Sequence, residues 1–200
     1  LQPTTRVAGG TSAEVATFED TRTGPPEVGG DLVVGAFNAE NYFVDFGEDE
    51  PGCEPTTDRD GAPSGLRNCR VRGAYDEAGF ERQSAKVVTA INTLGAHVLA
   101  LQEVQNTRGY PSGANPPDGV HPRDVALARL VDELNADAPG TWAYVPSPTD
   151  LPRSEDVIRN AFIYRPAHAE PVGDSTILTA PGAFRYGREP LAQAFAPADG

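Results

Sequence analysis

Apolar residues along the chain gather in short runs, separated by polar stretches rich in glycine and proline. The runs at 31–37 and 97–104 are continuous and of strand length, which predicts strands buried on both faces of a sheet. Shorter runs later in the chain predict further strands at 142–146, 157–164, about 175–178 and 190–195.

Two segments, 81–94 and 123–137, instead repeat their apolar residues with the period of a helix. The residues that share one helical face are Val87, Val88, Ile91 and Leu94 in the first and Leu127, Leu130, Val131 and Leu134 in the second. We expect both stripes to pack in the core. Helices early in the chain and strands late predict a mixed sheet with helices on its outer side.

The remaining stretches predict loops and one boundary. Residues 1–29 show no sustained period and end in PPEVGG, so we interpret them as a linker or the end of a preceding domain. Residues 30–200 then form one domain, or the N-terminal part of one, with enough residues for a core. Within it, 45–79 and 107–122 are predicted to be long irregular loops.

The composition is that of a soluble globular chain, with 38% hydrophobic residues and a mean hydropathy of −0.40. No apolar run approaches membrane-spanning length. The net charge is −13 and Lys86 is the only lysine, which argues against broad phosphate contacts to nucleic acid. A nuclease remains compatible with this charge, because bound metal ions reverse the sign locally.

Polar residues follow both long apolar runs, at Asn38 and Glu40 in LVVGAFNAEN and at Glu103 in HVLALQEVQN. Buried strands release their last polar residues at the rim of a sheet, so these side chains are expected to converge. Carboxylate and amide oxygens, completed by water, suit Mg²⁺. Strand alternation places Gln102 on the opposite face. Each candidate has an alternative. Glu103 could be a solvated glutamate at a strand end, and Asn38 could form an Asx-type turn. Asn41 could be the ligand in place of Glu40.

The pair FNAEN and LQEVQN resembles the endonuclease/exonuclease/phosphatase superfamily, in particular its deoxyribonuclease-like branch of secreted bacterial nucleases. Segments that resemble the superfamily follow in the same order: GAYDEAGFERQSAKVV (73–88), LARLVDELNADAPGTWAYV (127–145), RNAFIYRP (159–166) and GREPLAQAF (187–195). The resemblance covers about residues 28–200. It implies an α/β (α+β) fold of two packed mixed β-sheets flanked by helices, a four-layer α-β-β-α sandwich.

The resemblance also implies roles for single residues. Glu103 and Asn38 would hold Mg²⁺, with Mn²⁺ or Ca²⁺ as substitutes, and Asn38 would also help to place the attacking water. Arg188 would contact the scissile phosphate, because an arginine fork suits a phosphate that gains charge. Asp156 and Arg159 flank a predicted strand where relatives place a residue that orients the catalytic histidine. Asp156 would take that role, and Arg159 would help Arg188 to bind the substrate. The alternative for Arg188 is a surface arginine.

None of the three histidines, His97, His121 and His168, matches the catalytic histidine of the superfamily. Its later Asp-x-Asn and Ser-Asp-His motifs are also absent from these residues. We therefore expect this chain to be the N-terminal part of a nuclease domain, incomplete and inactive alone. Its expected partners are nucleic acid and the missing C-terminal half, with no membrane.

The two cysteines, Cys53 and Cys69, lie in the same polar stretch. A disulfide between them would close that loop and contribute roughly 3 kcal/mol. It would also indicate an oxidising compartment and hence secretion. The alternative is two free thiols. Zinc is disfavoured because no histidine or second cysteine pair lies nearby.

The predicted function is therefore metal-dependent phosphodiester hydrolysis by a secreted endonuclease that acts on DNA or RNA. A phosphomonoesterase or sphingomyelinase of the same superfamily shares these motifs and remains an alternative. A non-catalytic module that binds divalent metal or phosphate is the alternative from another class.

Overall fold

The computed structural model describes residues 19–21, 24, 26–108, 116–137, 141–179 and 187–198. Within these residues the chain has a mixed α+β fold with eight strands and two α-helices. The strands are β1 (Val34–Tyr42), β2 (Glu54–Thr57), β3 (Pro63–Arg67), β4 (Val98–Gln105), β5 (Ala143–Tyr144), β6 (Ile158–Tyr164), β7 (Ala169–Ile177) and β8 (Leu191–Pro197). The α-helices are α2 (Glu77–Thr93) and α3 (Val125–Asp137), and the 3-10 helices are η1 (Gly47–Asp49) and η2 (Pro122–Asp124).

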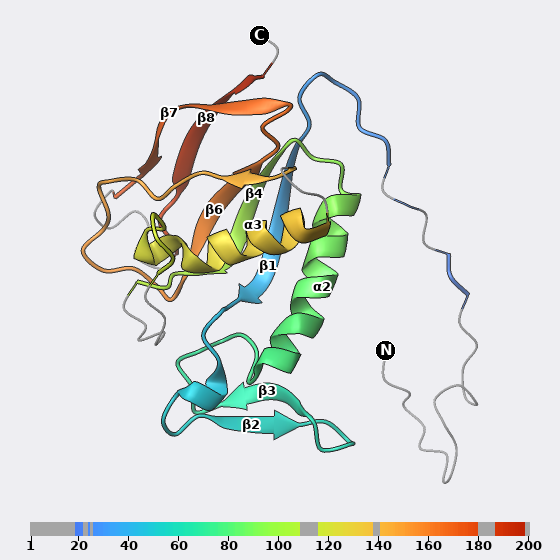
Figure 1. Ribbon diagram of the computed structural model, residues 1–200, viewed down its shortest axis with the longest axis vertical. Helices are drawn as coiled ribbons and strands as arrows, with labels where there is room; N and C mark the ends of the chain where they lie inside the picture. The colour runs from blue at the N-terminus through green and yellow to red at the C-terminus, as the bar shows by residue number, and fades with distance from the viewer. Residues whose placement is uncertain are drawn as a thin grey trace.

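The centre of the fold is a four-stranded mixed sheet with the order β1-β4-β6-β5. β1 runs parallel to β4, whereas β6 runs antiparallel to it. Figure 1 shows α3 lying across the front of this sheet and α2 running beside β1. The apolar faces of both helices join one core cluster with the sheet, through residues such as Ile91, Leu130, Leu101 and Ile163. This cluster confirms the predicted stripe of α3 and most of that of α2. The exception is Leu94, at the end of α2, which is 40% exposed and lies outside the cluster.

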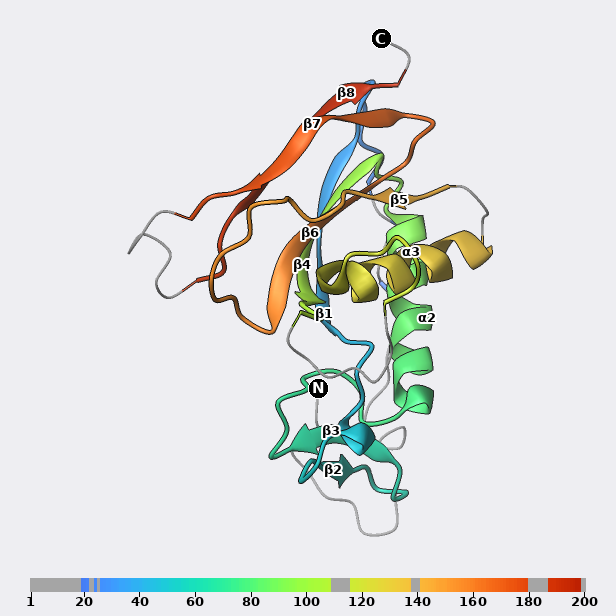
Figure 2. The same cartoon turned by 60° about the vertical axis from the view of Figure 1, so that its left-hand side comes forward.

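A second sheet, made of β7 and β8, lies on the other face of the central sheet (Figure 2). Phe195 of β8 packs against Phe162 and Tyr164 of β6, with ring centroids 5.9 Å apart in both pairs. The predicted packing of two sheets is therefore confirmed, with helices on the outer face of the central sheet. Both helices of the described part cover the central sheet, and none of the described residues forms a helix over β7 and β8.

The helices begin where the sequence supplies their caps. The Asp76 side chain accepts a hydrogen bond from Gly79 N at 2.7 Å, so α2 begins at Glu77, four residues before the predicted start. The 3-10 helix η2 carries Pro122 in its first turn and leads directly into α3. In the described parts of the chain, no helix has the length and apolar character needed to cross a membrane.

The structure corrects the prediction for 31–37, because β1 is not buried on both faces. The strand begins at Val34, which is 63% exposed and lies on a face of β1 that is open to solvent. β1 lies at the edge of its sheet, and no described element covers this face. Its other face is buried, with Ala39 and Tyr42 at 1% and 0% exposure.

The structure also corrects the prediction of an irregular loop at 45–79. This stretch contains η1, the antiparallel hairpin β2–β3 and the first turn of α2. The disulfide Cys53–Cys69 closes the hairpin, with the two Cα atoms 4.6 Å apart, and confirms the paired interpretation. The hairpin lies beyond the end of β1, below the central sheet in Figure 1.

Candidate active site

A β-bulge places Glu103 at the end of β4. The β4–β6 register passes from Leu101↔Ala161 directly to Val104↔Arg159, so Gln102 and Glu103 both stand opposite Asn160. Glu103 takes a left-handed backbone conformation, with φ of 60°. Leu101 and Val104 belong to the core on the helix side, so both intervening residues are turned off that face. The bulge interrupts the strict alternation on which the prediction for Gln102 rested.

A second bulge, in β1, stands beside Glu103. The β1–β4 register passes from Asn38↔Gln102 to Tyr42↔Val104, so residues 39–41 face the single residue Glu103. Glu40 and Asn41 are also left-handed, with φ of 52° and 56°. The two bulges bring Asn38, Glu40 and Glu103 to the same level of two adjacent strands, and neighbouring strands in a sheet are about 4.8 Å apart.

Helix α2 holds the β1 bulge in place. Gln83 Nε2 donates to the carbonyl oxygen of Glu40 at 2.9 Å and lies 3.5 Å from those of Ala39 and Asn41. Asn38 Oδ1 accepts a hydrogen bond from Glu40 N at 2.8 Å, which is the Asx-type turn considered for this residue. Both the N–H and the carbonyl group of Glu40 are therefore held by side chains.

Backbone strain concentrates at this place. Among the described residues, four non-glycine residues have positive φ, and three of them, Glu40, Asn41 and Glu103, lie in the paired bulges. A left-handed conformation costs on the order of 1–2 kcal/mol for such a residue. Strain of this kind persists where the surrounding structure enforces it, and it clusters at functional sites.

Glu103 is the best placed of the predicted metal ligands. Its carboxylate is partly buried, and it makes no hydrogen bond or ion pair with another described residue. Asn38 keeps a second lone pair on Oδ1, and Glu40 is exposed beside it. Two carboxylates and one amide oxygen, with water completing the shell, fit Mg²⁺. Within the described residues, no group of three or more His, Cys, Asp or Glu side chains is arranged to hold a metal.

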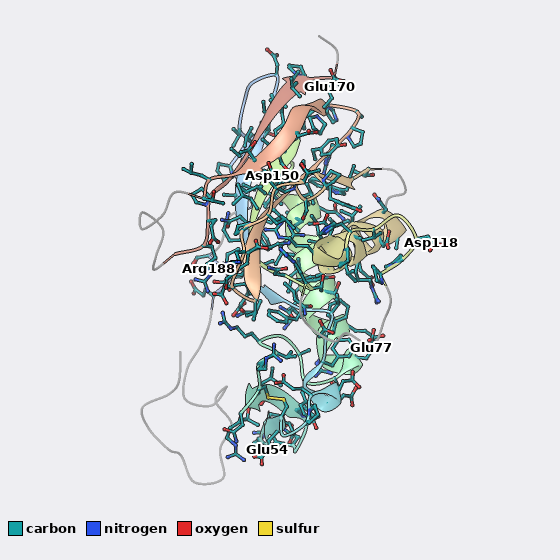
Figure 3. The ribbon with its side chains drawn as sticks, turned by 90° about the vertical axis from the view of Figure 1, so that its left-hand side faces the viewer. Glu54, Glu77, Asp118, Asp150, Glu170 and Arg188 are labelled. Atoms are coloured by element: carbon teal, nitrogen blue, oxygen red, sulfur yellow. A yellow bond between two sulfur atoms is a disulfide. The ribbon has the colours of Figure 1, made fainter. Side chains whose placement is uncertain are left out.

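Arg188 lies at the same end of the sheet, as Figure 3 shows. Its guanidinium pairs with Asp156 Oδ2 at 2.8 Å, and Arg72 pairs with Asp156 Oδ1 at 3.2 Å. The amide of Asn160 donates to Glu189 O at 3.2 Å, which anchors the Arg188 segment to β6 opposite Glu103. Asp156 therefore orients two partly exposed arginines at the rim; in this structure it contacts no histidine.

The structure gives Arg159 a different place from the one predicted. Arg159 is 4% exposed and pairs with Asp124 at 2.7 Å in a buried network that also contains Arg123, Glu155 and Ser147. Burial lowers the pKa of Arg159 to about 10, although the nearby Asp124 carboxylate opposes this shift. Its register partner Val104 faces the helices, so Arg159 is on the far side from the bulges. We assign it a structural role.

The three histidines lie away from the paired bulges. His97 stacks on His168 at the opposite end of β4, with ring centroids 4.1 Å apart. His121 accepts a hydrogen bond from Arg123 N and caps η2. None of the three histidines therefore contacts the residues of the paired bulges.

The sequence interpretation missed Gln83, Asn160 and Arg72. Alternation does not single out Asn160, because Phe162 and Tyr164, which share its face, are as apolar as Ala161 and Ile163 on the other face. Nothing in the local sequence indicates that Gln83 faces the β1 bulge.

A scan against protein-family models finds no family that matches this chain, and a search of curated proteins finds no relative with a significant match.

Proposed function

We propose that this protein functions as a metal-dependent phosphodiesterase, most simply a secreted endonuclease that acts on DNA or RNA. The observation that carries the proposal is Glu103, a partly buried carboxylate with no partner among the described residues, held in a left-handed bulge beside Asn38. The resemblance of the strand-end segments to the endonuclease/exonuclease/phosphatase superfamily supports the same assignment.

The side chains at and near the bulges would have different roles in hydrolysis. Glu103 and Asn38, with Glu40 beside them, would hold Mg²⁺, Mn²⁺ or Ca²⁺. A bound divalent ion polarises a phosphoryl oxygen and stabilises its developing charge. Arg188 would donate to a non-bridging oxygen of the same phosphate, where a charged donor stabilises the transition state more than the ground state. Asp156 acts as a positioning residue, because it fixes the direction of Arg188.

Secretion is part of the proposal. The disulfide Cys53–Cys69 supports it, because structural disulfides form and persist in oxidising compartments.

A second candidate is binding of metal or phosphate without turnover. The positions of His97, His121 and His168 favour it for this chain, since none of the three is at the paired bulges to protonate a leaving group. The two candidates predict the same metal site and differ only in hydrolysis.

The first experiment tests the metal site by thermal unfolding of the chain with and without Mg²⁺ or Mn²⁺. Ion binding to the folded state should raise Tm. Glu103→Gln keeps size and hydrogen bonding but removes the charge, so the rise in Tm should shrink while Tm in EDTA changes little. Glu170→Gln, at the exposed far end of the molecule in Figure 3, is the matched control and should behave as wild type. An identical metal-induced rise in Tm in Glu103→Gln and wild type would contradict the assignment of the metal site.

The second experiment tests hydrolysis with the full product of the gene and supercoiled plasmid DNA. Glu103→Gln should lower nicking by about a hundredfold or more. Arg188→Ala should lower nicking while leaving the metal-induced rise in Tm intact, because it contacts phosphate and not the ion. Nicking by Glu103→Gln at the wild-type rate would contradict the proposed function, and a metal response without any nicking would favour the binding module.

A further inference from the structure

A large cleft opens beside the β1 bulge. It has a volume of about 1010 Å³ and lies between the end of β1, the β2–β3 hairpin with the segment that follows it, and α2 from Gly79 to Ala90. Asn38, Glu40 and Asn41 line it at the bulge, so the cleft begins where the candidate metal ligands are.

Basic side chains line this cleft although the whole chain carries a net charge of −13. They are Arg72, Arg82 and Lys86, and Lys86 is the only lysine of the sequence. Arg82 and Lys86 are one helical turn apart on α2, which puts their Cβ atoms about 5–6 Å apart. Both residues are exposed.

Arg82 and Lys86 differ from most other basic residues in their pairing. Several arginines in the described part have a carboxylate partner, namely Arg59, Arg67, Arg72, Arg108, Arg123, Arg129, Arg159 and Arg188. Arg82 and Lys86 have none among the described residues. The two acidic residues of the cleft do not cancel them, because Asp58 Oδ1 is held by Asp60 N and Ala62 N, and Glu40 is at the bulge.

We propose that this cleft binds one strand of a nucleic acid through its phosphates, with Arg82 and Lys86 as contacts on one side of the cleavage point. This inference rests on the proposed function, and it gives the path of the nucleic-acid strand beyond the bond that is cleaved. Arg72 connects the two places, because it lines the cleft and also shares Asp156 with Arg188. The cationic side chains therefore extend from the scissile phosphate at Arg188, through Arg72, to α2.

A polyphosphate chain fits these observations better than a small anion. The cleft is at the upper limit of small-molecule sites, which are roughly 300–1,000 Å³. Its cations are spread over a helix and a loop and do not converge on one point. Separate phosphates along a backbone match such a spread, and each contact releases counterions.

The test is a titration of the chain with a fluorescent single-stranded DNA 12-mer in EDTA, followed by anisotropy at several salt concentrations; an RNA 12-mer is the second probe. Loss of both contacts in Arg82→Ala/Lys86→Ala should weaken binding at least tenfold at low salt. The slope of log K against log salt should fall by about 1.4, since each single-strand phosphate contact contributes about 0.7. Arg82→Lys/Lys86→Arg keeps both charges and should keep the slope.

The matched control is Arg59→Ala/Arg153→Ala, which removes the same charge from two exposed arginines outside the cleft. An equal loss in this control, or an unchanged slope in Arg82→Ala/Lys86→Ala, would overturn the proposal. The titration contains no metal, so Glu103→Gln should bind like wild type. Failure of the metal site and failure of the cleft are therefore separate results.

Discussion

Gln83 is the single residue on which the geometry of the β1 bulge depends most directly. Its one amide nitrogen faces three successive carbonyl oxygens of a strained segment, and its side chain comes from a helix. Asparagine adopts the left-handed conformation more readily than other side chains, but the left-handed Glu40 has no such propensity and depends on the hydrogen bond from Gln83. Gln83 therefore acts on the candidate metal ligands through the backbone.

Gln83→Leu should cost about 1 kcal/mol of stability, or a fall in Tm of roughly 2–4 °C. It should also reduce the metal-induced rise in Tm, because Asn38 and Glu40 lose their fixed positions. Gln193→Leu is the control, since Gln193 donates in the same way to Val172 O, Gly173 O and Ala194 O of the β7–β8 sheet. If both variants lose stability and keep the full metal response, Gln83 has no positioning role.

Single residues also show where sequence reasoning stops. The left-handed conformation of Glu103 follows from a register shift between β4 and β6, which local sequence does not contain. Arg159 was predicted at the site although it stands two residues from Ala161 and four from Ile163, both core residues. Alternation alone would have placed Arg159 on their side, away from a ligand.

At the scale of elements, the β2–β3 hairpin depends on local crosslinks and lacks an apolar core of its own. Its strands have four and five residues, and it is closed by Cys53–Cys69 and by the Arg67–Glu54 pair. The Glu50 carboxylate accepts from Arg70 N and Val71 N at 2.8 Å, which fixes the segment that leads to Arg72.

Cys53→Ser/Cys69→Ser should therefore lower stability by about 3 kcal/mol at most, and the hairpin should become sensitive to limited proteolysis. Glu54→Gln, which removes only the exposed ion pair, should cost no more than about 1 kcal/mol. Non-reducing peptide mapping of the wild type should give one crosslinked peptide. Two free thiols in protein folded under oxidising conditions would contradict both the bond and the argument for secretion.

The elements themselves were predictable to different degrees. α3 follows from strong apolar periodicity and β4 from a continuous apolar run, and their observed bounds lie within two residues of the predicted ones. The hairpin was missed because EPTT and PSGLR contain no apolar run, and a proline begins β3. β7 was predicted only at 175–178 because its first residues, AEPVGD, are too polar to read as a strand.

At the scale of the whole molecule, a pair of stacked histidines joins strands from both sheets. His97 Nδ1 accepts from Val33 N at 3.2 Å just before β1, and its carbonyl oxygen accepts from Arg165 N after β6. His168 O accepts from Ala198 N after β8. Burial, His168 and Arg165, in that order, lower the pKa of His97 below its ordinary value of 6.5.

The unfolded chain therefore binds a proton at His97 more readily than the folded chain. Stability from this residue is complete above pH 6.5 and should be lost as the pH falls through the lower pKa of the folded state. Urea unfolding between pH 5 and 8 should show this fall, and His97→Asn, which keeps an acceptor but cannot titrate, should reduce it. An equal fall in His97→Asn and wild type would show that other groups cause it.

Helix α2 also constrains how the gene can vary in length. One helix carries core residues on one face, Gln83 beside them and the cleft residues Arg82 and Lys86 further round. Inserting one residue between Lys86 and Val87 rotates everything before that point by about 100° relative to the core residues Val87 and Ile91. All three sets would lose their register at once. The β2–β3 turn at 58–62 is exposed and carries no such coupling, so insertions between related genes should accumulate there and spare the helix.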